Sequence, residues 1–225
     1  MQIEKFTLDF LDKLKENNNR DWFADHKSEF TKAQDNIKGF YAKIQENLEA
    51  HDEIEKLKIY RIYRDVRFSK DKTPYKTHFS GSLSRSGKAL RGGYYLQVSP
   101  TDSFLAGGFW APEKDDLFRI RKEIEMDDSE FRDILKSDDF VKYFGGEFKG
   151  DELKTAPKGF DKSHTAIDLI RKKGYIAVRN FSQKEVLSPD FLSEVDVTFK
   201  ALRPFFNLFS DVLTTNLNGE SLLDG

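Results

Sequence analysis

The sequence predicts an α+β fold in which an antiparallel β-meander packs against several helices. Two observations lead to this prediction. Helical periodicity and strand alternation occur in separate blocks rather than in regular βαβ alternation, and the strand-like runs in the middle of the chain are joined by short turns. Since no Pro/Gly/Ser-rich linker divides the 225 residues, we expect one domain over residues 1–215 and a loose tail at 216–225.

Apolar residues at helical spacing predict two helices at the start of the chain. The first covers Thr7–Glu16 and ends at an Asn-rich turn. The second begins after Asn19, a good N-cap, and Asp21 in its first turn suits the positive end of the helix dipole. Its apolar stripe continues almost to Ala50, so we expect one long helix.

The middle of the chain predicts the meander. We expect a strand at Ile59–Phe68, a turn at Ser69–Pro74 and, because the segment is small and polar, an exposed loop at Ser80–Gly93. Tyr94–Val98 and Ser103–Trp110 form the next two predicted strands. Inside the last strand Gly107 and Gly108 predict a bulge, or close approach of a ligand or another backbone segment.

The last part of the chain predicts helices with one further strand. Pro112 suits the first position of a helix, and Asp127 to Ser129 ends that helix and caps the next. Beyond it we expect a short helix at residues 140–144 closed by Gly145, a helix at Thr165–Lys173, a strand at Tyr175–Arg179, and a terminal helix that opens at residues 188–190 and is interrupted at Pro204.

Composition narrows the classes of function. The chain has no cysteine, which excludes disulfides, thiol nucleophiles and cysteine-based zinc sites and suits a reducing compartment. No stretch approaches the length of a membrane span, and residues 1–14 lack the apolar run of a signal peptide. We therefore expect a soluble cytoplasmic protein with no membrane partner.

Positive charge is concentrated in one segment. The net charge of the chain is -2, yet residues 58–91 contain ten basic residues against only Asp65 and Asp71. A local basic field on an otherwise acidic body indicates a defined anionic ligand more than general adhesion to nucleic acid or membrane.

The predicted strand and turn suggest how such a ligand is held. Asp65 between two guanidiniums on one strand face fixes a fork that suits phosphate or carboxylate. We expect three arginines to clamp the anion and lysines and a tyrosine of the turn to add donors: Arg61, Arg64, Arg67, Lys72, Tyr75 and Lys76. The competing interpretation is a solvated cluster of ion pairs, with Arg64 paired to a core carboxylate.

Two further groups extend the predicted site. The loop Leu153–Phe160, through Lys154 and Lys158, can close over the same ligand or simply be solvated. His78 and His164 lie in or beside basic segments, where they, and with less support Asp65, are candidates for proton transfer. No metal-ligand spacing occurs, and the sequence assigns no cofactor, reaction or oligomeric state.

Two alternatives to a small-ligand pocket stay open. The whole basic segment 58–91, with its interleaved aromatic residues, can recognise nucleic acid or an acidic protein. A structural or interaction role without any small ligand is the other alternative.

Several motifs resemble an uncharacterised family found in bacteria and fungi and catalogued as a domain of unknown function, number 2461. The resemblance implies an intracellular single-domain protein and brings no activity, cofactor or catalytic residue. Gln97 stands where similar sequences have His. The motifs that carry the resemblance are residues 18–23, 64–78, 93–96, 107–113 and 153–160.

Overall fold

A computed structural model describes residues 1–223 and contains one sheet of five strands. Every strand pairs with its neighbour in the chain, in the order β1-β2-β3-β4-β5, which is the predicted antiparallel meander within an α+β fold. The strands are β1 (Ile54–Ile59), β2 (Phe79–Arg85), β3 (Gly93–Val98), β4 (Ser103–Phe109) and β5 (Tyr175–Phe181).

The residues group into two compact units, and β2 to β5 each contribute residues to both. Unit 1 takes residues 1–83, 95–105 and 180–197, and unit 2 takes the remaining described residues.

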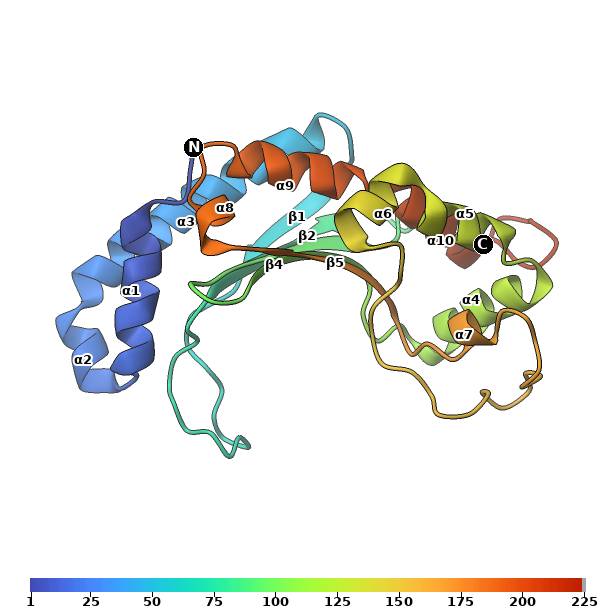
Figure 1. The fold of residues 1–225 in the computed structure, drawn as a ribbon, viewed down its shortest axis with the longest axis horizontal. Coiled ribbons are helices and arrows are strands. Elements are labelled where there is room, and N and C mark those ends of the chain that lie inside the picture. Colours follow the sequence, from blue (N-terminus) through green and yellow to red (C-terminus); the bar gives the residue numbers. More distant parts are fainter. Residues whose placement is uncertain (224–225) are drawn as a thin grey trace. The chain divides into compact units, whose positions relative to one another are not determined.

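The N-terminal helices belong to unit 1. They are α1 (Lys5–Glu16), α2 (Arg20–Asp25) and α3 (Lys27–Glu49), with α1 alongside α3 in Figure 1. Asn19 caps α2 as predicted, because its side chain accepts a hydrogen bond from the backbone N–H of Trp22 at 2.9 Å. The prediction of one unbroken helix to Ala50 is wrong. His26 leaves helical geometry, stacks on the Trp22 ring at 4.0 Å and bonds to the Trp22 carbonyl, so the chain turns between α2 and α3.

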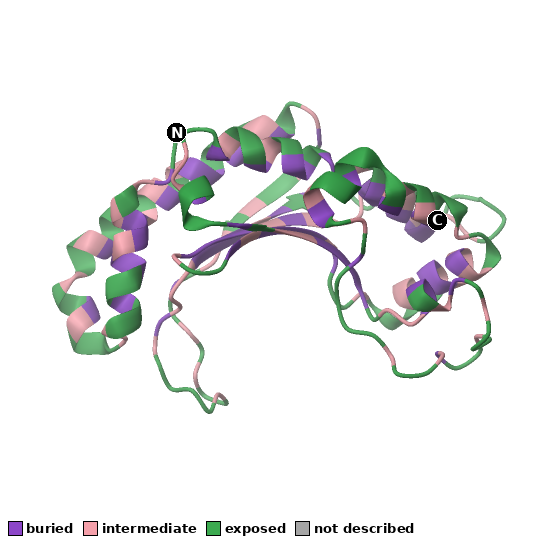
Figure 2. Ribbon diagram, in the orientation of Figure 1, coloured by how far each residue is buried: buried purple, intermediate pink, exposed green. Residues whose placement is uncertain are grey.

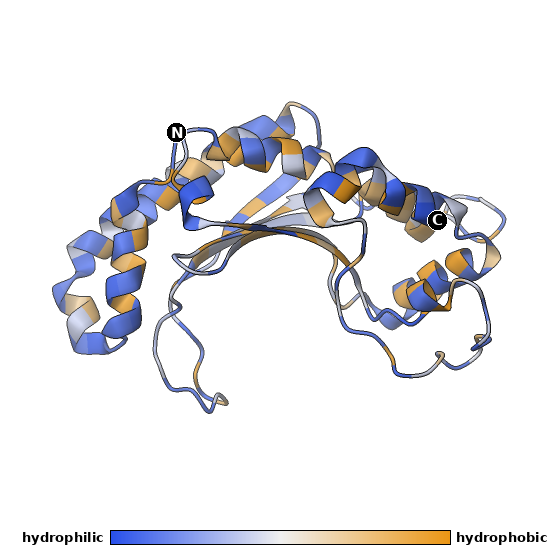
Figure 3. Cartoon of the chain, in the orientation of Figure 1, coloured by the Kyte–Doolittle hydropathy of each residue, from blue (hydrophilic) through white to orange (hydrophobic). Residues whose placement is uncertain are grey.

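One face of α3 packs on the sheet within unit 1. Buried and hydrophobic residues recur along this helix in Figures 2 and 3. Tyr41 is completely buried and its hydroxyl donates to the Leu96 carbonyl at 2.5 Å. Gly81 lies under the Tyr41 ring, where a Cβ would come within 2.7 Å of a ring carbon. Gly81 is therefore required by packing.

The first two strands correct the sequence prediction. The first strand is Ile54–Ile59, not Ile59–Phe68, and Ser80–Gly93 is not wholly a loop because β2 occupies its first part. β1 is hard to recognise in the sequence because it contains several charged residues. They are tolerated because β1 is an edge strand that is exposed to water on one face. In β2 a glycine occurs at position 81 because Tyr41 fills the space above it.

The helices of unit 2 surround an aromatic core. Phe205 and Phe209 lie at its centre, with ring centroids 4.6 Å apart. Six further aromatic residues pack around them, all buried: Phe109, Phe131, Phe140, Phe148, Tyr175 and Phe206. The helices that lie wholly in unit 2 are α4 (Lys114–Met126), α5 (Ser129–Lys136), α6 (Asp138–Phe144), α7 (Ile167–Ile170) and α10 (Arg203–Thr214).

Several boundaries differ from the predictions. Pro112 lies two residues before α4, and the predicted helix Thr165–Lys173 shrinks to α7 because turns occupy both flanks. Gly145 closes α6 in the left-handed conformation, as expected. Short α8 (Gln183–Val186) was not predicted, and the terminal helix divides into α9 (Phe191–Lys200) and α10, with Pro204 in the first turn of α10.

The glycine pair of β4 confirms the prediction of a close approach by another backbone segment. Gly108 has a φ of 138°, and a Cβ there would lie 2.2 Å from the Tyr175 carbonyl oxygen. The neighbouring Gly107 makes room for Leu202 and Phe206. These glycines serve packing inside unit 2.

At the C-terminus, residues 214–222 form a hydrogen-bonded turn in which the Leu222 N–H donates to the Thr214 carbonyl at 2.8 Å. Residues 224 and 225 of the predicted tail lie outside the described residues. Across residues 1–223, no helix combines the length and apolar character needed to cross a membrane.

Candidate functional site

Part of the basic segment, residues 60–76, extends from the sheet between β1 and β2 (Figure 1), and we call it the arm. Its two sides pair through few backbone bonds: Lys76 N–H donates to the Ile62 carbonyl at 2.8 Å and Arg64 N–H to the Pro74 carbonyl at 2.9 Å. Burial alternates along residues 60–67, with the even-numbered residues less exposed than the odd-numbered ones, and this alternation ends at Phe68, which is 97% exposed whereas Ile62 is buried.

The base of the arm is anchored to α2 and the turn before it. The Asn18 side chain accepts from the Tyr75 N–H at 3.1 Å and donates to the Tyr75 carbonyl at 2.9 Å. The Tyr75 ring stacks on Phe23 with centroids 4.0 Å apart. Burial raises the pKa of the Tyr75 hydroxyl. Tyr75, predicted as a ligand-binding residue, therefore packs in the base of the arm.

Charged side chains brace the outer half of the arm. Arg64 donates to the Asp71 carboxylate at 2.5 Å and to the Thr73 carbonyl at 3.0 Å. Asp71 also accepts from the Thr73 N–H at 2.9 Å, and the bonds from Thr73 and Arg64 lower the pKa of Asp71 to about 2. Lys72 donates to the Val66 carbonyl at 2.9 Å. These bonds hold a loop that has little apolar contact of its own.

A second ion pair lies next to this brace. Asp65 accepts two hydrogen bonds from the Arg67 guanidinium, at 3.0 and 2.7 Å, which lower the pKa of the Asp65 carboxyl. Arg61 acts on Asp65 only as a weaker, more distant charge. Asp65 is thus tied to one guanidinium, and the Arg67 side chain is 76% exposed.

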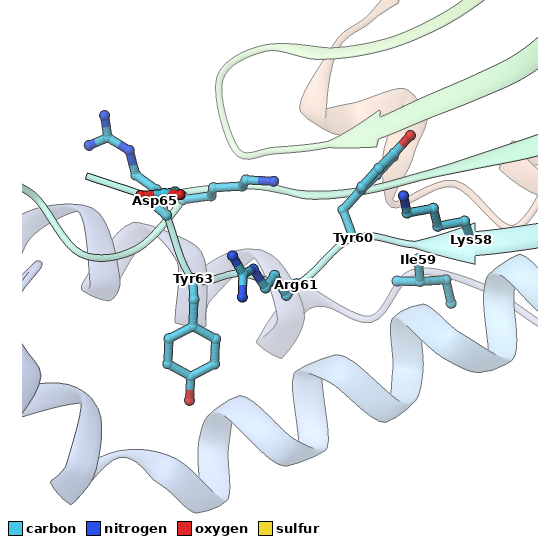
Figure 4. A pocket seen from close by; sticks show the side chains of 8 residues that line it. Lys58, Ile59, Tyr60, Arg61, Tyr63 and Asp65 are labelled. Carbon is cyan, nitrogen blue, oxygen red and sulfur yellow. The ribbon is translucent and has the colours of Figure 1, made fainter. Parts of the chain in front are cut away.

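A pocket of about 620 Å³ opens where β1 meets the arm (Figure 4). Lys58 and Tyr60 point to one side of the chain and Tyr63 to the other. The ammonium groups of Lys58 and Lys76 lie 5.2 and 5.5 Å from the centre of the Tyr60 ring, and the Tyr60 hydroxyl lies 3.1 Å from that of Ser82. We call this the cation pocket; its lining residues are Lys58, Ile59, Tyr60, Arg61, Tyr63, Arg64, Asp65 and Lys76.

Three cations of the cation pocket have no carboxylate partner. Within residues 1–223, Lys58, Arg61 and Lys76 form no ion pair, whereas Arg64 and Asp65 are each matched on the arm. Burial, followed by the charge of Arg61, lowers the pKa of Lys76, and Tyr60 opposes this shift. The pocket therefore holds like charges close together, an arrangement that an anion would stabilise.

The two candidate histidines lie in different environments. His78 is half-buried in unit 1, and burial followed by the charge of Lys76 lowers its pKa, against a smaller opposing effect of Asp102. Among the described residues its ring makes no hydrogen bond. His164 belongs to unit 2, where its Nδ1 accepts from the Ala166 N–H at 3.1 Å. His78 is thus an uncommitted imidazole near a residue of the cation pocket.

The structure brings together part of the predicted ligand-binding set. Arg61, Arg64, Lys76 and Asp65 line the cation pocket; Arg67, Lys72 and Tyr75 lie on the arm outside its lining. Lys154 and Lys158 are exposed residues of unit 2, and their role stays a prediction. The predicted set did not include Lys58, which lies in β1, or Tyr60, the first residue of the arm. No three His, Asp or Glu residues in residues 1–223 are placed to hold a metal ion.

Comparison with protein families gives one match. The family model described as "Conserved hypothetical protein (DUF2461)" matches residues 6–208, which is most of the chain and includes the arm and the whole cation pocket. Searches of curated proteins and of solved structures find no significant match.

Proposed function

Starting from a chain that belongs to the DUF2461 family of conserved hypothetical proteins, we propose that it is a cytoplasmic protein that binds a phosphate- or carboxylate-bearing ligand in the cation pocket. The observation that carries this proposal is the set of three cations, Lys58, Arg61 and Lys76, that share the pocket without a carboxylate partner among residues 1–223. The absence of cysteine supports a reducing compartment.

The division of charge on the arm supports this assignment. Both carboxylates of the arm are already neutralised, Asp65 by Arg67 and Asp71 by Arg64. Neither forms an ion pair with Lys58, Arg61 or Lys76, so these three cations are available to an incoming anion. In the binding mode we propose, Arg61 presents its planar guanidinium to the anion while Lys58 and Lys76 approach from beside Tyr60.

Titration calorimetry with inorganic phosphate tests the proposal. We expect Arg61→Ala and Lys76→Ala each to weaken phosphate binding about tenfold, because each removes one unpaired charge. Lys56→Ala is the matched control, since Lys56 is an exposed lysine of β1 that does not line the pocket. Wild-type affinity in both pocket variants, or no binding to the wild type, would contradict the proposal.

The predicted loop residues need a separate variant. Lys154→Ala with Lys158→Ala removes the loop cations and leaves the cation pocket unchanged. Weaker phosphate binding in this double variant would support a contribution of the loop, and unchanged binding would confine the site to β1 and the arm.

The second candidate is an enzymatic role. The His78 ring makes no hydrogen bond among the described residues, and burial followed by the charge of Lys76 lowers its pKa. In hydrolysis of a phosphomonoester, His78 would take a proton from a water molecule while the oxygen of that water forms a bond to phosphorus. The bond between phosphorus and the oxygen of the leaving alcohol breaks, and His78 passes the proton to that alcohol. The expected result is slow turnover of p-nitrophenyl phosphate that His78→Gln abolishes while phosphate binding is kept. No turnover by the wild type would count against this role.

A further inference from the structure

We propose that the natural ligand is single-stranded nucleic acid, with one phosphate in the cation pocket, further phosphates along the arm and a base stacked on Phe68. This inference rests on the proposed anion-binding function and names its ligand class. It concerns unit 1 alone, since the pocket and the arm both belong to residues 1–83.

Phe68 is the first observation. Phe68 is 97% exposed, which makes it the most exposed large hydrophobic residue among those described, and its ring centre lies 6.0 Å from the guanidinium of Arg67. A phenylalanine in this position contributes nothing to a core. An exposed ring beside a guanidinium is the arrangement on which proteins stack unpaired bases.

The distribution of cations is the second observation. Positive charge continues from the cation pocket to the tip, where Lys70 and Lys72 are exposed and form no ion pair among the described residues. Asp65 and Asp71 balance only Arg67 and Arg64, so the other four cations of residues 60–76 leave the arm with a positive excess.

The rigidity of the arm is the third observation. Asn18 fixes the base at Tyr75, and the Arg64 brace to Asp71 fixes the outer half. A ligand that binds along the arm therefore does not have to order it first, which lowers the entropic cost of binding.

The pattern favours nucleic acid over a membrane. A membrane anchor concentrates apolar side chains at its tip, together with a second signal for stable attachment. Here the tip carries one aromatic ring, and two further aromatic residues of the arm, Tyr60 and Tyr63, alternate with Lys58 and Arg61 near the base. Aromatic residues interleaved with cations are typical of surfaces that bind single-stranded nucleic acid.

Fluorescence anisotropy with labelled eight-nucleotide strands, one of DNA and one of RNA with the same sequence, tests the inference. Phe68→Ala should weaken binding of the strand about tenfold. The same variant should leave binding of inorganic phosphate and of an unlabelled linear polyphosphate unchanged, because neither has a base to stack. Trp110→Ala is the matched control, since Trp110 is another exposed aromatic residue, 81% exposed, in unit 2.

Salt dependence gives a second measurement. For single strands the logarithm of the binding constant should fall with the logarithm of salt concentration by about 0.7 per neutralised phosphate. Arg61→Ala should reduce that slope and also weaken phosphate binding, whereas Phe68→Ala should leave the slope unchanged. Binding of either the DNA or the RNA strand in this pattern supports the inference.

The outcomes separate the two proposals. Phosphate binding without strand binding overturns this inference and leaves the proposed function intact, whereas absence of both overturns both. Wild-type affinity of Phe68→Ala for the strand also overturns the inference. So does Phe68-dependent binding to vesicles of phosphatidylserine and phosphatidylcholine in the absence of strand binding, because it would identify a membrane as the partner.

Discussion

The arm of unit 1 and the aromatic core of unit 2 are stabilised by opposite means. The arm keeps its shape through side-chain hydrogen bonds and ion pairs such as Arg64 to Asp71, at positions open to water. The core of unit 2 is formed by rings such as Phe205 and Phe209, which are completely buried. Burial of apolar area does not depend on pH, whereas exposed ion pairs respond to pH and salt.

This difference indicates which of the two regions can bind a polar ligand. The side chains of the core are buried against one another, so they cannot contact a polar ligand. The arm has little buried apolar area, and it presents its cations and the Phe68 ring to solvent. The following predictions test whether the two regions respond as differently as their contacts imply.

The largest effect should come from opening the core. Phe209→Ala should lower the free energy of unfolding by about 3–5 kcal/mol, because it removes a buried ring that stacks on Phe109 at 4.9 Å and leaves a cavity. Phe68→Ala removes the same side chain from the arm and should change stability by less than about 0.5 kcal/mol. Urea denaturation followed by circular dichroism measures both, and similar losses in the two variants would refute the contrast.

A medium effect should come from the buried sheet face of unit 1. Tyr41→Phe removes the hydroxyl that donates to the Leu96 carbonyl and should cost about 1–2 kcal/mol, since Tyr41 is wholly buried. The same denaturation experiment measures the loss. Tyr63→Phe is the control, because the Tyr63 side chain is 43% exposed and water can replace its hydrogen bond. A neutral Tyr41→Phe would show that the hydroxyl contributes nothing beyond its ring.

Much of the fold could be predicted because its signals are local. The spacing of apolar residues in α1, the capping side chain of Asn19 and the left-handed Gly145 each act within a few residues of the chain. β1 and β2 were missed because their signals are not local. The charges of β1 suit an edge strand, and Gly81 is explained only by Tyr41, which is forty residues away in the chain.

The candidate site was predictable in its charge and not in its geometry. The excess of positive charge in residues 58–91 identifies the segment, but the choice among its cations depends on which carboxylate each one reaches. Asp71 reaches Arg64 only because the arm folds back at residues 65–73, and this leaves Arg61 unpaired. The sequence predicted that all three arginines clamp the ligand, with a core carboxylate as the alternative partner of Arg64.

A smaller effect should come from removing the brace. Arg64→Ala should lower global stability by less than about 1 kcal/mol, because the ion pair with Asp71 is exposed. The local effect should be larger. Hydrogen exchange at the Thr73 amide, which donates to Asp71, should accelerate several-fold as the arm loosens. Arg67→Ala is the control, since its pair with Asp65 lies outside the brace; equal acceleration in both variants would mean that Arg64 has no special role.

The smallest effect in free energy, and the most specific one, should come from acid. The bonds from Thr73 and Arg64 lower the pKa of Asp71 to about 2, from an ordinary value near 3.8. The contribution of the charged carboxylate to arm structure is therefore complete above pH 4 and is lost as the pH falls from 4 to 2.

NMR-detected hydrogen exchange separates this local loss from global unfolding. The protection factor of the Thr73 amide, which is its exchange rate relative to that of an unstructured peptide at the same pH, should fall over that pH range while the ring signals of Phe209 stay native, because the burial of apolar rings does not depend on pH. Asp71→Asn should show faster exchange already at pH 7, since the amide keeps an acceptor for Thr73 but loses the charge that holds Arg64. If the arm and the core instead loosened together at every pH, the brace would be part of one cooperative structure, and the contrast between the two regions would be refuted.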